Sequence, residues 1–417
     1  MPSNGGQPAA VTAGRRWPVA LRSLRHRDFR LFWGGLVVSV TGTWMQNAAQ
    51  AWLVYDLTGS SFWLGAVGAC GTLPLLLFTL PAGVIADRLS KRNIVLVTQS
   101  LATVQAFALA ALTYAGVIQV WHVMVLAALL GVVNAFDNPA RQAMVIELAS
   151  KEDLLNAVAL NSSAFNAGRI VGPAIGGVLI AAVGTATCFL INGISFGALL
   201  IALAHIRRRP PGEVNKAAMA RQIVDGIAWA RRQPVIKSLL VLTAISSIFG
   251  MSYATLLPVF AKDLFHTGPQ GYGFLMSSYA VGALLSALGL TSFGHRWALG
   301  RPLTLGSFLF PVALLAVALA PRYALAMVAL FLTGLGMMLF NAVSNTIIQK
   351  SAPSEMRGRA MSIRALLFMG MTPVGSLQIG AMGEWLGPRF AVAIGGAICL
   401  IAAMTAWRLV PELRKSE

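Results

Sequence analysis

Twelve long runs of apolar residues are the feature that most limits how this chain can fold. A membrane-spanning helix needs about 20 mostly apolar residues. Only 11% of the residues are charged, against about 25% in soluble domains, so the chain cannot cover a water-facing surface. Helices satisfy their own backbone hydrogen bonds in lipid, and the sequence therefore predicts an all-α membrane protein. The expected spans are 31–55, 62–86, 94–115, 121–144, 155–182, 186–206, 235–262, 271–293, 302–320, 323–349, 360–384 and 389–409.

Lys and Arg are distributed unevenly over the loops between these spans. An even number of spans places both chain ends on one side, and 28 of the 32 Lys and Arg residues fall there. Because Lys and Arg are retained in the cytoplasm, we expect both termini to be cytoplasmic, in a plasma or bacterial inner membrane. The net charge of +18 then reflects topology and attraction to anionic lipid headgroups, and no nucleic-acid partner is expected.

The chain is also expected to contain two related halves. A shift of 203 residues aligns six identical pairs: Asn138 with Asn341, Ala149 with Ala352, Ala157 with Ala360, Gly172 with Gly375, Gly177 with Gly380 and Gly184 with Gly387. Two pseudo-symmetric six-helix halves enclosing a midplane site are therefore predicted. The expected divisions are a tail at 1–30, a half at 31–206, a linker at 207–234, a half at 235–409 and a tail at 410–417. Residues 217–232 of the linker form either a short surface helix or a solvated tether.

The loop between spans two and three carries the first recognisable motif. Its sequence has a glycine, Asp-Arg and two further basic residues in the pattern of the major facilitator loop signature, with Ser90 replacing the second glycine. This resemblance implies a cytoplasmic latch between the halves, formed in one state and broken in the other, on Gly83, Asp87, Arg88, Lys91 and Arg92. The corresponding loop of the second half, 294–301, lacks the acidic residue.

Span five matches every fixed position of the superfamily's antiporter signature, at Gly168, Gly172, Pro173, Gly176 and Gly177. Glycine and proline loosen a helix and let neighbouring backbones approach. In that family the signature accompanies exporters that exchange substrate for protons; helix packing alone is the other interpretation.

A narrower resemblance lies in the stretch 138–143, together with Asn156 and Ala157. It is similar to a branch containing bacterial siderophore exporters of the enterobactin type and macrolide-efflux-like proteins. The resemblance implies a twelve-helix major facilitator fold and a secondary active transporter of small molecules, with protons as coupling ion. We expect a monomer in contact with membrane lipids and no cofactor, metal or enzymatic activity.

Arg169 is the strongest candidate for function within a span. It lies roughly 21 Å into span five at 1.5 Å per residue, and charged groups at such depth are costly. Ser162, Asn166 and Arg169 share a helical face that is expected to look into a cavity. We expect Arg169 either to bind an anionic substrate or to pair with a proton-carrying carboxylate; a structural arginine bonded to backbone carbonyls is the alternative.

Asp137 is the acidic residue expected well inside a span. Arg141 lies four residues later on the same face of span four, so the two side chains can pair. Asp137 is expected either to couple transport to the proton gradient or to form half of a cytoplasmic gate.

Span one supplies a row of polar side chains beside an aromatic ring. Thr43, Gln46, Asn47 and Gln50 share one helical face next to Trp44, which suits a cavity wall for a semi-polar ligand. Hydrogen bonding between helices is the alternative. In the second half, Tyr253 is expected on the opposite wall.

Several functions remain open at this point. Export of a small molecule by alternating access is favoured, with transport of lipid, lysolipid or nutrient on the same fold as the alternative. A membrane sensor is disfavoured because a static scaffold needs neither latch nor polar midplane. No phosphate-binding loop, metal motif or nucleophile elbow indicates an enzyme.

Overall fold

The computed structural model describes residues 19–206, 228–293 and 298–414, and within these ranges the Asp87 side chain is not described. The first half contains six long helices. They are α1 (Arg27–Thr58), α2 (Ser61–Arg88), α3 (Lys91–Tyr114), α4 (Val120–Leu148), α5 (Leu154–Val183) and α6 (Thr185–His205), with short helices η1 (Val19–Arg25) and η2 (Lys151–Asp153).

The second half has the same plan with two interrupted spans. The seventh span consists of α8 (Pro234–Ile245), η3 (Ser246–Gly250), η4 (Met251–Leu256), α9 (Leu257–Val259) and η5 (Phe260–Leu264). After it come α10 (Gly268–Phe293), α11 (Gly300–Leu319), α12 (Tyr323–Ser351), α13 (Ser354–Gly370), α14 (Thr372–Leu386), α15 (Pro388–Leu409) and η7 (Pro411–Arg414). Segments η3 and η5 are π-helical, and such wide turns often mark functional sites.

The prediction of an all-α membrane protein with twelve spans is confirmed. Eleven helical segments in the described part are long and apolar enough to cross a membrane. The one remaining span is α1, the first in the chain, which is 32 residues long. It carries the row of polar side chains described for span one. The eleventh span begins at Ser354, six residues before its expected start, because polar residues continue the helix beyond the apolar run.

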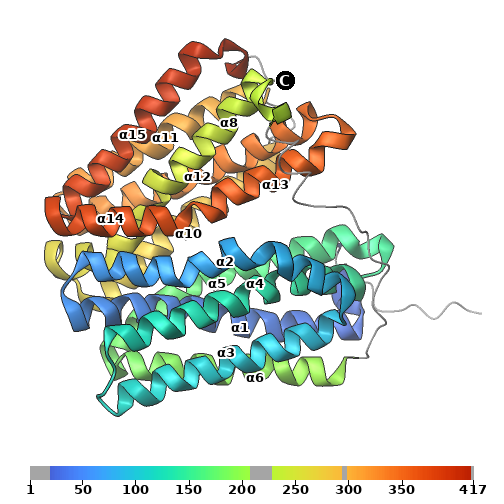
Figure 1. The fold of residues 1–417 in the computed structure, drawn as a ribbon, viewed down its shortest axis with the longest axis vertical. Coiled ribbons are helices and arrows are strands. Elements are labelled where there is room, and N and C mark those ends of the chain that lie inside the picture. Colours follow the sequence, from blue (N-terminus) through green and yellow to red (C-terminus); the bar gives the residue numbers. More distant parts are fainter. Residues whose placement is uncertain (1–18, 207–227, 294–297, 415–417) are drawn as a thin grey trace, which may run out of the picture.

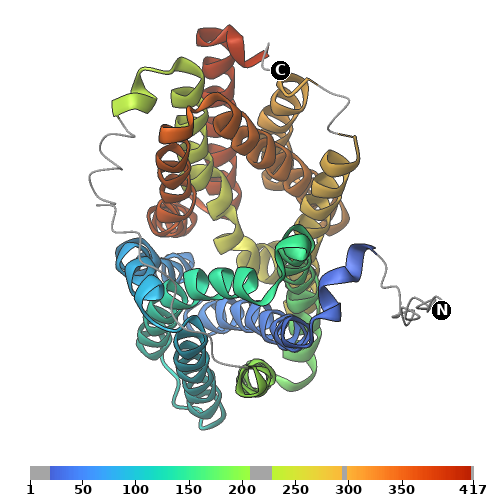
Figure 2. The same ribbon diagram turned by 90° about the vertical axis from the view of Figure 1, so that its right-hand side faces the viewer.

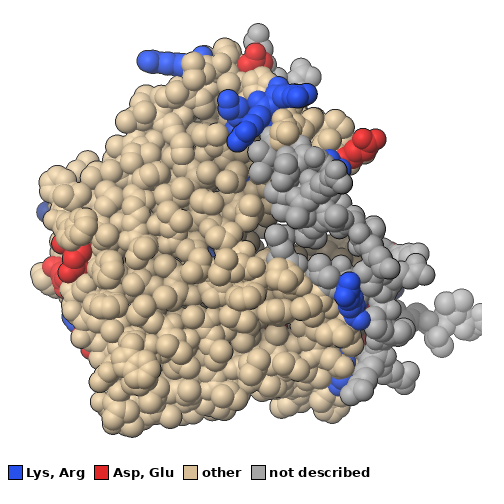
Figure 3. Space-filling view, viewed as in Figure 1, with Lys and Arg blue, Asp and Glu red and all other residues tan. Residues whose placement is uncertain are grey.

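The two halves lie side by side and diverge toward one end (Figure 1). We call the end where α1 begins and α15 finishes the linker end, and the opposite end the far end. Figure 2 views the molecule from the linker end and shows the helices of each half as a separate bundle. The middle of the surface in Figure 3 is uncharged, and charged side chains lie at its edges. A lipid-facing belt requires this distribution.

Two of the six aligned pairs show that the duplication predicted from the sequence is present in the structure. Gly184 and Gly387 both adopt positive φ, at 82° and 85°, in the turn before the last helix of each half. A methyl group on Gly172 would meet the α1 backbone, and one on Gly375 would meet Ile248 of η3. Corresponding residues therefore occupy corresponding places in two pseudo-symmetric halves.

Glycines of the span-five signature hold two different interfaces. Gly168, Gly172 and Gly176 face α1, where an added methyl group would lie within 3.3 Å of Val40, Thr41 or Met45. Gly177 faces the other half, where its methyl group would lie 2.5 Å from the Pro269 carbonyl oxygen of α10. The signature thus packs α5 against its own half and joins it to the other.

The second contact between halves is built in the same way. A methyl group on Gly65 of α2 would lie 3.0 Å from the Gly380 Cα of α14. Gly380 is the repeat partner of Gly177. Both contacts lie in the turns nearest the far end, so the two halves meet there through glycine backbone.

The N-terminal segment docks on the turn between α4 and α5. Asp153, 1% exposed, pairs with Arg22 at 3.0 Å, Arg25 at 2.9 Å and His26 at 2.8 Å. The hydrogen bond from His26 and the charges of both arginines lower the pKa of the Asp153 carboxyl. This cluster orients the start of α1. The linker helix expected at 217–232 lies largely outside the described residues.

We expect Gly177→Ala to destabilise the protein by about 1–3 kcal/mol, because the methyl group overpacks backbone against backbone. Thermal unfolding of the purified protein in detergent measures this. Gly197→Ala on α6 is the matched control, since nothing lies within 4 Å of its added methyl group. Equal unfolding temperatures for the two variants would contradict the close α5–α10 contact.

Candidate substrate cavity

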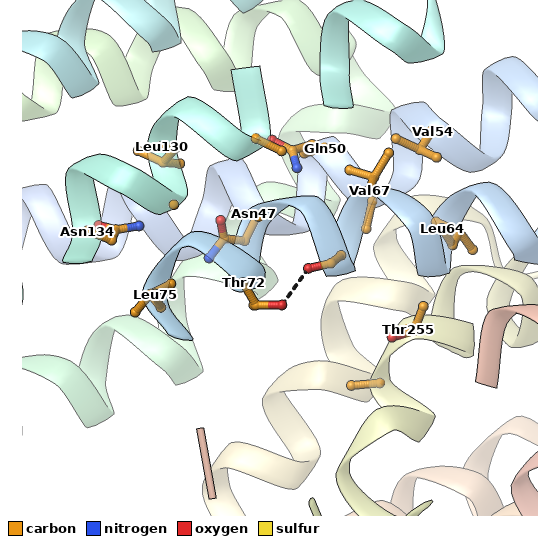
Figure 4. A pocket seen from close by; sticks show the side chains of 16 residues that line it. Asn47, Gln50, Val54, Leu64, Val67, Thr72, Leu75, Leu130, Asn134 and Thr255 are labelled. Carbon is orange, nitrogen blue, oxygen red and sulfur yellow. Dashed lines mark hydrogen bonds between the residues drawn. The ribbon is translucent and has the colours of Figure 1, made fainter. Parts of the chain in front are cut away.

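A cavity of about 330 Å³ lies between α1, α2, α4 and η4, where the two halves face each other (Figure 4). Asn47, Gln50 and Asn134 line it and have no hydrogen-bond partner within the described part of the chain. Thr72 instead donates to the Gly68 carbonyl of its own helix at 2.8 Å. Three amides are therefore available to a ligand among apolar walls, and we call this cavity the amide pocket.

A second cavity, of about 740 Å³, continues toward the linker end, and we call it the linker-end pocket. Leu75 lines both cavities. Most of the polar lining of the second cavity comes from α4 and α5, with Thr79 from α2, and Met369 of α13 lies on its wall. The sequence-predicted residues Arg141, Ser162 and Asn166 are brought together here. Asn166 donates to the Ser162 carbonyl at 2.9 Å.

The pairing expected between Asp137 and Arg141 is present, with a nitrogen–oxygen distance of 3.1 Å. Asp137 is 1% exposed and also accepts hydrogen bonds from Thr98 at 2.8 Å and Gln99 at 3.0 Å. Its carboxylate therefore ties α4 to α3 and does not line either pocket. Arg141 extends from it to the linker-end pocket, where its guanidinium also lies 4.9 Å from the Phe165 ring centre.

Arg169 lies one turn beyond the linker-end pocket, at the seam between α5 and α10. Its guanidinium is 5.7 Å from the ring centre of Tyr279, and this ring lies 6.0 Å from that of Tyr253. The Nε atom of Arg169 is buried without a hydrogen-bond partner. No carboxylate of the described residues pairs with it. Tyr253 is buried beside this seam and not exposed on a cavity wall.

Arg364 is a buried charge that sequence reasoning missed. It is one of the 28 Lys and Arg residues counted on the cytoplasmic side, but it lies within α13 and is 8% exposed. Its Nη2 donates to the backbone and side-chain oxygens of Asn341 on α12. In the first half, Arg141 donates to Asn138, the repeat partner of Asn341, at 2.8 Å. The alignment of Asn138 with Asn341 was the sequence signal for this buried arginine, because each asparagine accepts a hydrogen bond from an arginine.

The polar face predicted for α1 is divided between two environments. Gln46 does not line a cavity: it is 1% exposed, donates to Gln105 at 3.0 Å and accepts from Asn192 at 2.8 Å. Its expected place on the cavity wall is wrong, because α3 and α6 cover that side of α1. Thr43 donates to the Ser39 carbonyl at 2.9 Å, and Trp44 packs against Gly172. Asn47 and Gln50 alone of this row line the amide pocket.

Basic residues of the latch loop make contacts inside the first half. Lys91 pairs with Glu147 at the end of α4 at 3.4 Å, and Arg92 donates to the Leu203 carbonyl at the end of α6 at 2.7 Å. Arg88 is exposed, and nothing lies within 4 Å of a methyl group added at Gly83. In this state the described part of the loop braces three helices of its own half.

A polar seam across the far end was not anticipated from the sequence. Lys262 pairs with Asp56 at 2.6 Å, and Tyr55 donates to Asp263. Glu384 accepts from the Ser60 hydroxyl at 3.0 Å and from the Phe62 backbone N–H at 3.3 Å. Each of these bonds joins the first half to the second. We call these residues the far-end seam.

Comparison with known proteins comes from three directions. The family described as transmembrane secretion effector matches residues 19–417. A staphyloferrin A transporter of Staphylococcus aureus is 29% identical over 89% of this chain and 94% of its own. The multidrug efflux pump Tap of Mycolicibacterium fortuitum is 26% identical over 83% and 87% of the two chains. Macrolide efflux protein A of Streptococcus pyogenes is 22% identical over 93% and 96%.

Solved structures share the fold at lower identity. A bacterial homologue of the human lysosomal transporter Spinster, described as inward-facing and unoccupied, matches with a TM-score of 0.75 and 12% identity, covering 97% of this chain and 99% of its own. The nucleoside transporter NupG matches with a TM-score of 0.74 and 14% identity, covering 94% and 99%. These likenesses indicate a common architecture.

Breaking the Tyr55–Asp263 bond should loosen the far end. We expect Asp263→Asn to shift the ratio of open to closed far ends about 5-fold, the equivalent of roughly 1 kcal/mol for a weakened charged hydrogen bond. Spin labels at Val183 and Phe390, both exposed, in a background with the three native cysteines replaced by alanine, report the distance.

The control for this measurement is Asp28→Asn, which removes a carboxylate at the linker end, where Asp28 lies 3.9 Å from Arg27. An equal change of the label distance in both variants would argue against a specific role of the far-end seam.

Proposed function

This chain belongs to the transmembrane secretion effector family within the major facilitator superfamily, and from that membership we propose that it exports a small molecule across the inner membrane by alternating access. Relatives along nearly the whole chain are named for siderophore transport, multidrug efflux and macrolide efflux. A siderophore, an antibiotic or another amphipathic metabolite is the proposed substrate class. The observation that carries the proposal is a pair of adjoining pockets between two halves that are joined at the far end.

The proposed orientation places the linker end in the cytoplasm. The positive-inside distribution of Lys and Arg supports it. In that orientation the far-end seam and the glycine contacts close the outer side, and the pockets accept substrate from inside. Transport then requires the two halves to separate at both the far-end seam and the glycine contacts. The latch residues Asp87 and Arg88 are proposed to join the halves at the cytoplasmic side in the outward-facing state.

Charge inside the spans favours an anionic substrate. Among described residues, the charged side chains more than six residues from the ends of their spans are Arg141, Arg169, Arg364 and Asp137. The described spans thus hold one deeply placed carboxylate and three deeply placed guanidinium groups. Unpaired charge is costly within a membrane. An anionic group of the substrate between Arg141 and Arg169 supplies the missing counter-charge.

Proton antiport is proposed on the antiporter signature of span five, with Asp137 as the proton-carrying residue. Its partner Arg141 is bonded to Asp137 on one side and borders the linker-end pocket on the other. Exchange requires a proton to be taken up from the outer side after substrate release, and to be released to the cytoplasm before the next substrate binds. The ion pair between Asp137 and Arg141 is proposed to break when the carboxyl takes up the proton and to form again when the proton leaves.

Untargeted mass spectrometry of cells and medium tests export. Strains compared lack the protein, overproduce it, or overproduce Asp87→Asn. We expect one compound to accumulate inside the deletion strain and to appear outside only with the intact protein, and an uncoupler to abolish its export. Faster depletion of a nutrient from the medium, or redistribution of lipid between leaflets, would replace export with uptake or lipid transport.

Arg169→Ala is expected to raise the KM for an anionic substrate about 10- to 100-fold, corresponding to the loss of a charged hydrogen bond of roughly 1.5–3 kcal/mol. Transport into inverted vesicles measures it, and Arg169→Lys should retain part of the affinity. Arg301→Ala, an exposed cation at the start of α11, is the control. Unchanged KM in Arg169→Ala would make this residue a structural one.

A further inference from the structure

An apolar groove of about 590 Å³ separates α8 from α15 on the outer surface of the second half. It belongs to neither pocket described above. Its walls carry aliphatic side chains with Lys237 at the linker end. Along the groove the lining residues are Lys237, Val241, Ile245, Ile398, Ile401 and Leu409, with small residues between them.

The groove exists because α15 is fixed to a different neighbour. Near the middle of the span the two helices meet, with the Cys399 sulfur 3.9 Å from the Ile245 carbonyl oxygen. Closer to the linker end, Trp407 on the opposite side of α15 donates to Thr304 of α11 at 3.0 Å. The facing positions Ala402, Ala406 and Ser238 are too small to fill the space that remains.

The dimensions of the groove match one lipid leaflet. From Lys237 to Ile245 are eight residues, roughly 12 Å along a helix. The hydrocarbon of one leaflet is about 15 Å thick, half of a typical bilayer core. An extended acyl chain can therefore lie along the groove for most of its depth.

The linker end of the groove carries unbalanced positive charge. Lys237 and the neighbouring Arg231, Arg232 and Arg408 are exposed and take part in no ion pair within the described part of the chain. The nearby carboxylate, Glu412 of η7, has a partner of its own. Figure 3 shows Lys and Arg side chains gathered at the linker end of this half, above uncharged surface.

We propose that this groove is a binding site for one anionic phospholipid of the cytoplasmic leaflet. Its phosphate contacts Lys237, and one acyl chain packs against Val241 and Ile401 between the two helices. The bound lipid fills the space between the seventh and twelfth spans and supplies a counter-charge to the cations that are unpaired among the described residues. The site is separate from export; only the choice of leaflet rests on the proposed orientation.

Native mass spectrometry of the purified full chain, titrated with phosphatidylglycerol or with phosphatidylcholine of the same acyl chains, tests the site. We expect phosphatidylglycerol to bind more tightly, and Lys237→Gln to weaken its binding about 5-fold, as one cation near the headgroup contributes about 1 kcal/mol. Ala402→Phe, which fills the groove and keeps the charges, should abolish tight binding of both lipids. Val241→Trp fills it from α8 and covers the case in which the α15 variant does not fold.

Three results would overturn the proposal. The first is equal affinity of the unaltered protein for the two lipids. The second is an equal loss of binding in Lys237→Gln and in the control Arg30→Gln, which removes an exposed cation at the linker end of α1. The third is full displacement of phosphatidylglycerol by glycerol phosphate at millimolar concentration, which would indicate a site for a free anion.

Discussion

The hydrocarbon core of a membrane offers no hydrogen bonds, and this single constraint organises the structure. Backbone groups pair within helices, and polar side chains inside the bundle must pair with one another or face a cavity. The first half follows this rule through two buried clusters, one around Gln46 and Gln105 and one around Asp137. These clusters hold α1, α3, α4 and α6 together within the first half.

The two halves meet through a different kind of contact. Gly177 against α10 and Gly65 against Gly380 bring backbones together without interlocking side chains. Such surfaces gain packing energy only at close approach and lose it once they separate. The far-end seam adds charged bonds at the rim of the same interface. Glycine contacts and the polar rim together join the halves at the far end, and the proposed transport cycle requires both to separate.

The polar groups without partners among the described residues lie at the two places where we propose that other molecules bind. Asn47, Gln50 and Asn134 line the amide pocket. Arg169 lies where α5 meets α10, and its Nε has no hydrogen-bond partner. Outside the bundle, Lys237 stands over an apolar groove. The proposed substrate and the proposed lipid satisfy the same physical requirement, since each brings negative or polar groups to unpaired positive ones.

The sequence by itself determined the all-α fold, the twelve spans and the related halves, because apolar run length and the repeat of Asn138, Gly172, Gly177 and Gly184 are local or internal patterns. It also predicted that Asn47, Gln50, Ser162 and Asn166 lie on faces that line a cavity, and that Arg141 pairs with Asp137. Tertiary structure alone decided that Gln46 is buried, that Arg364 lies inside the protein, and that Asp56, Asp263 and Glu384 join the halves. The physical reason is that a helix has polar residues on more than one side, and only packing determines whether each side meets another helix, the opposite half or a cavity.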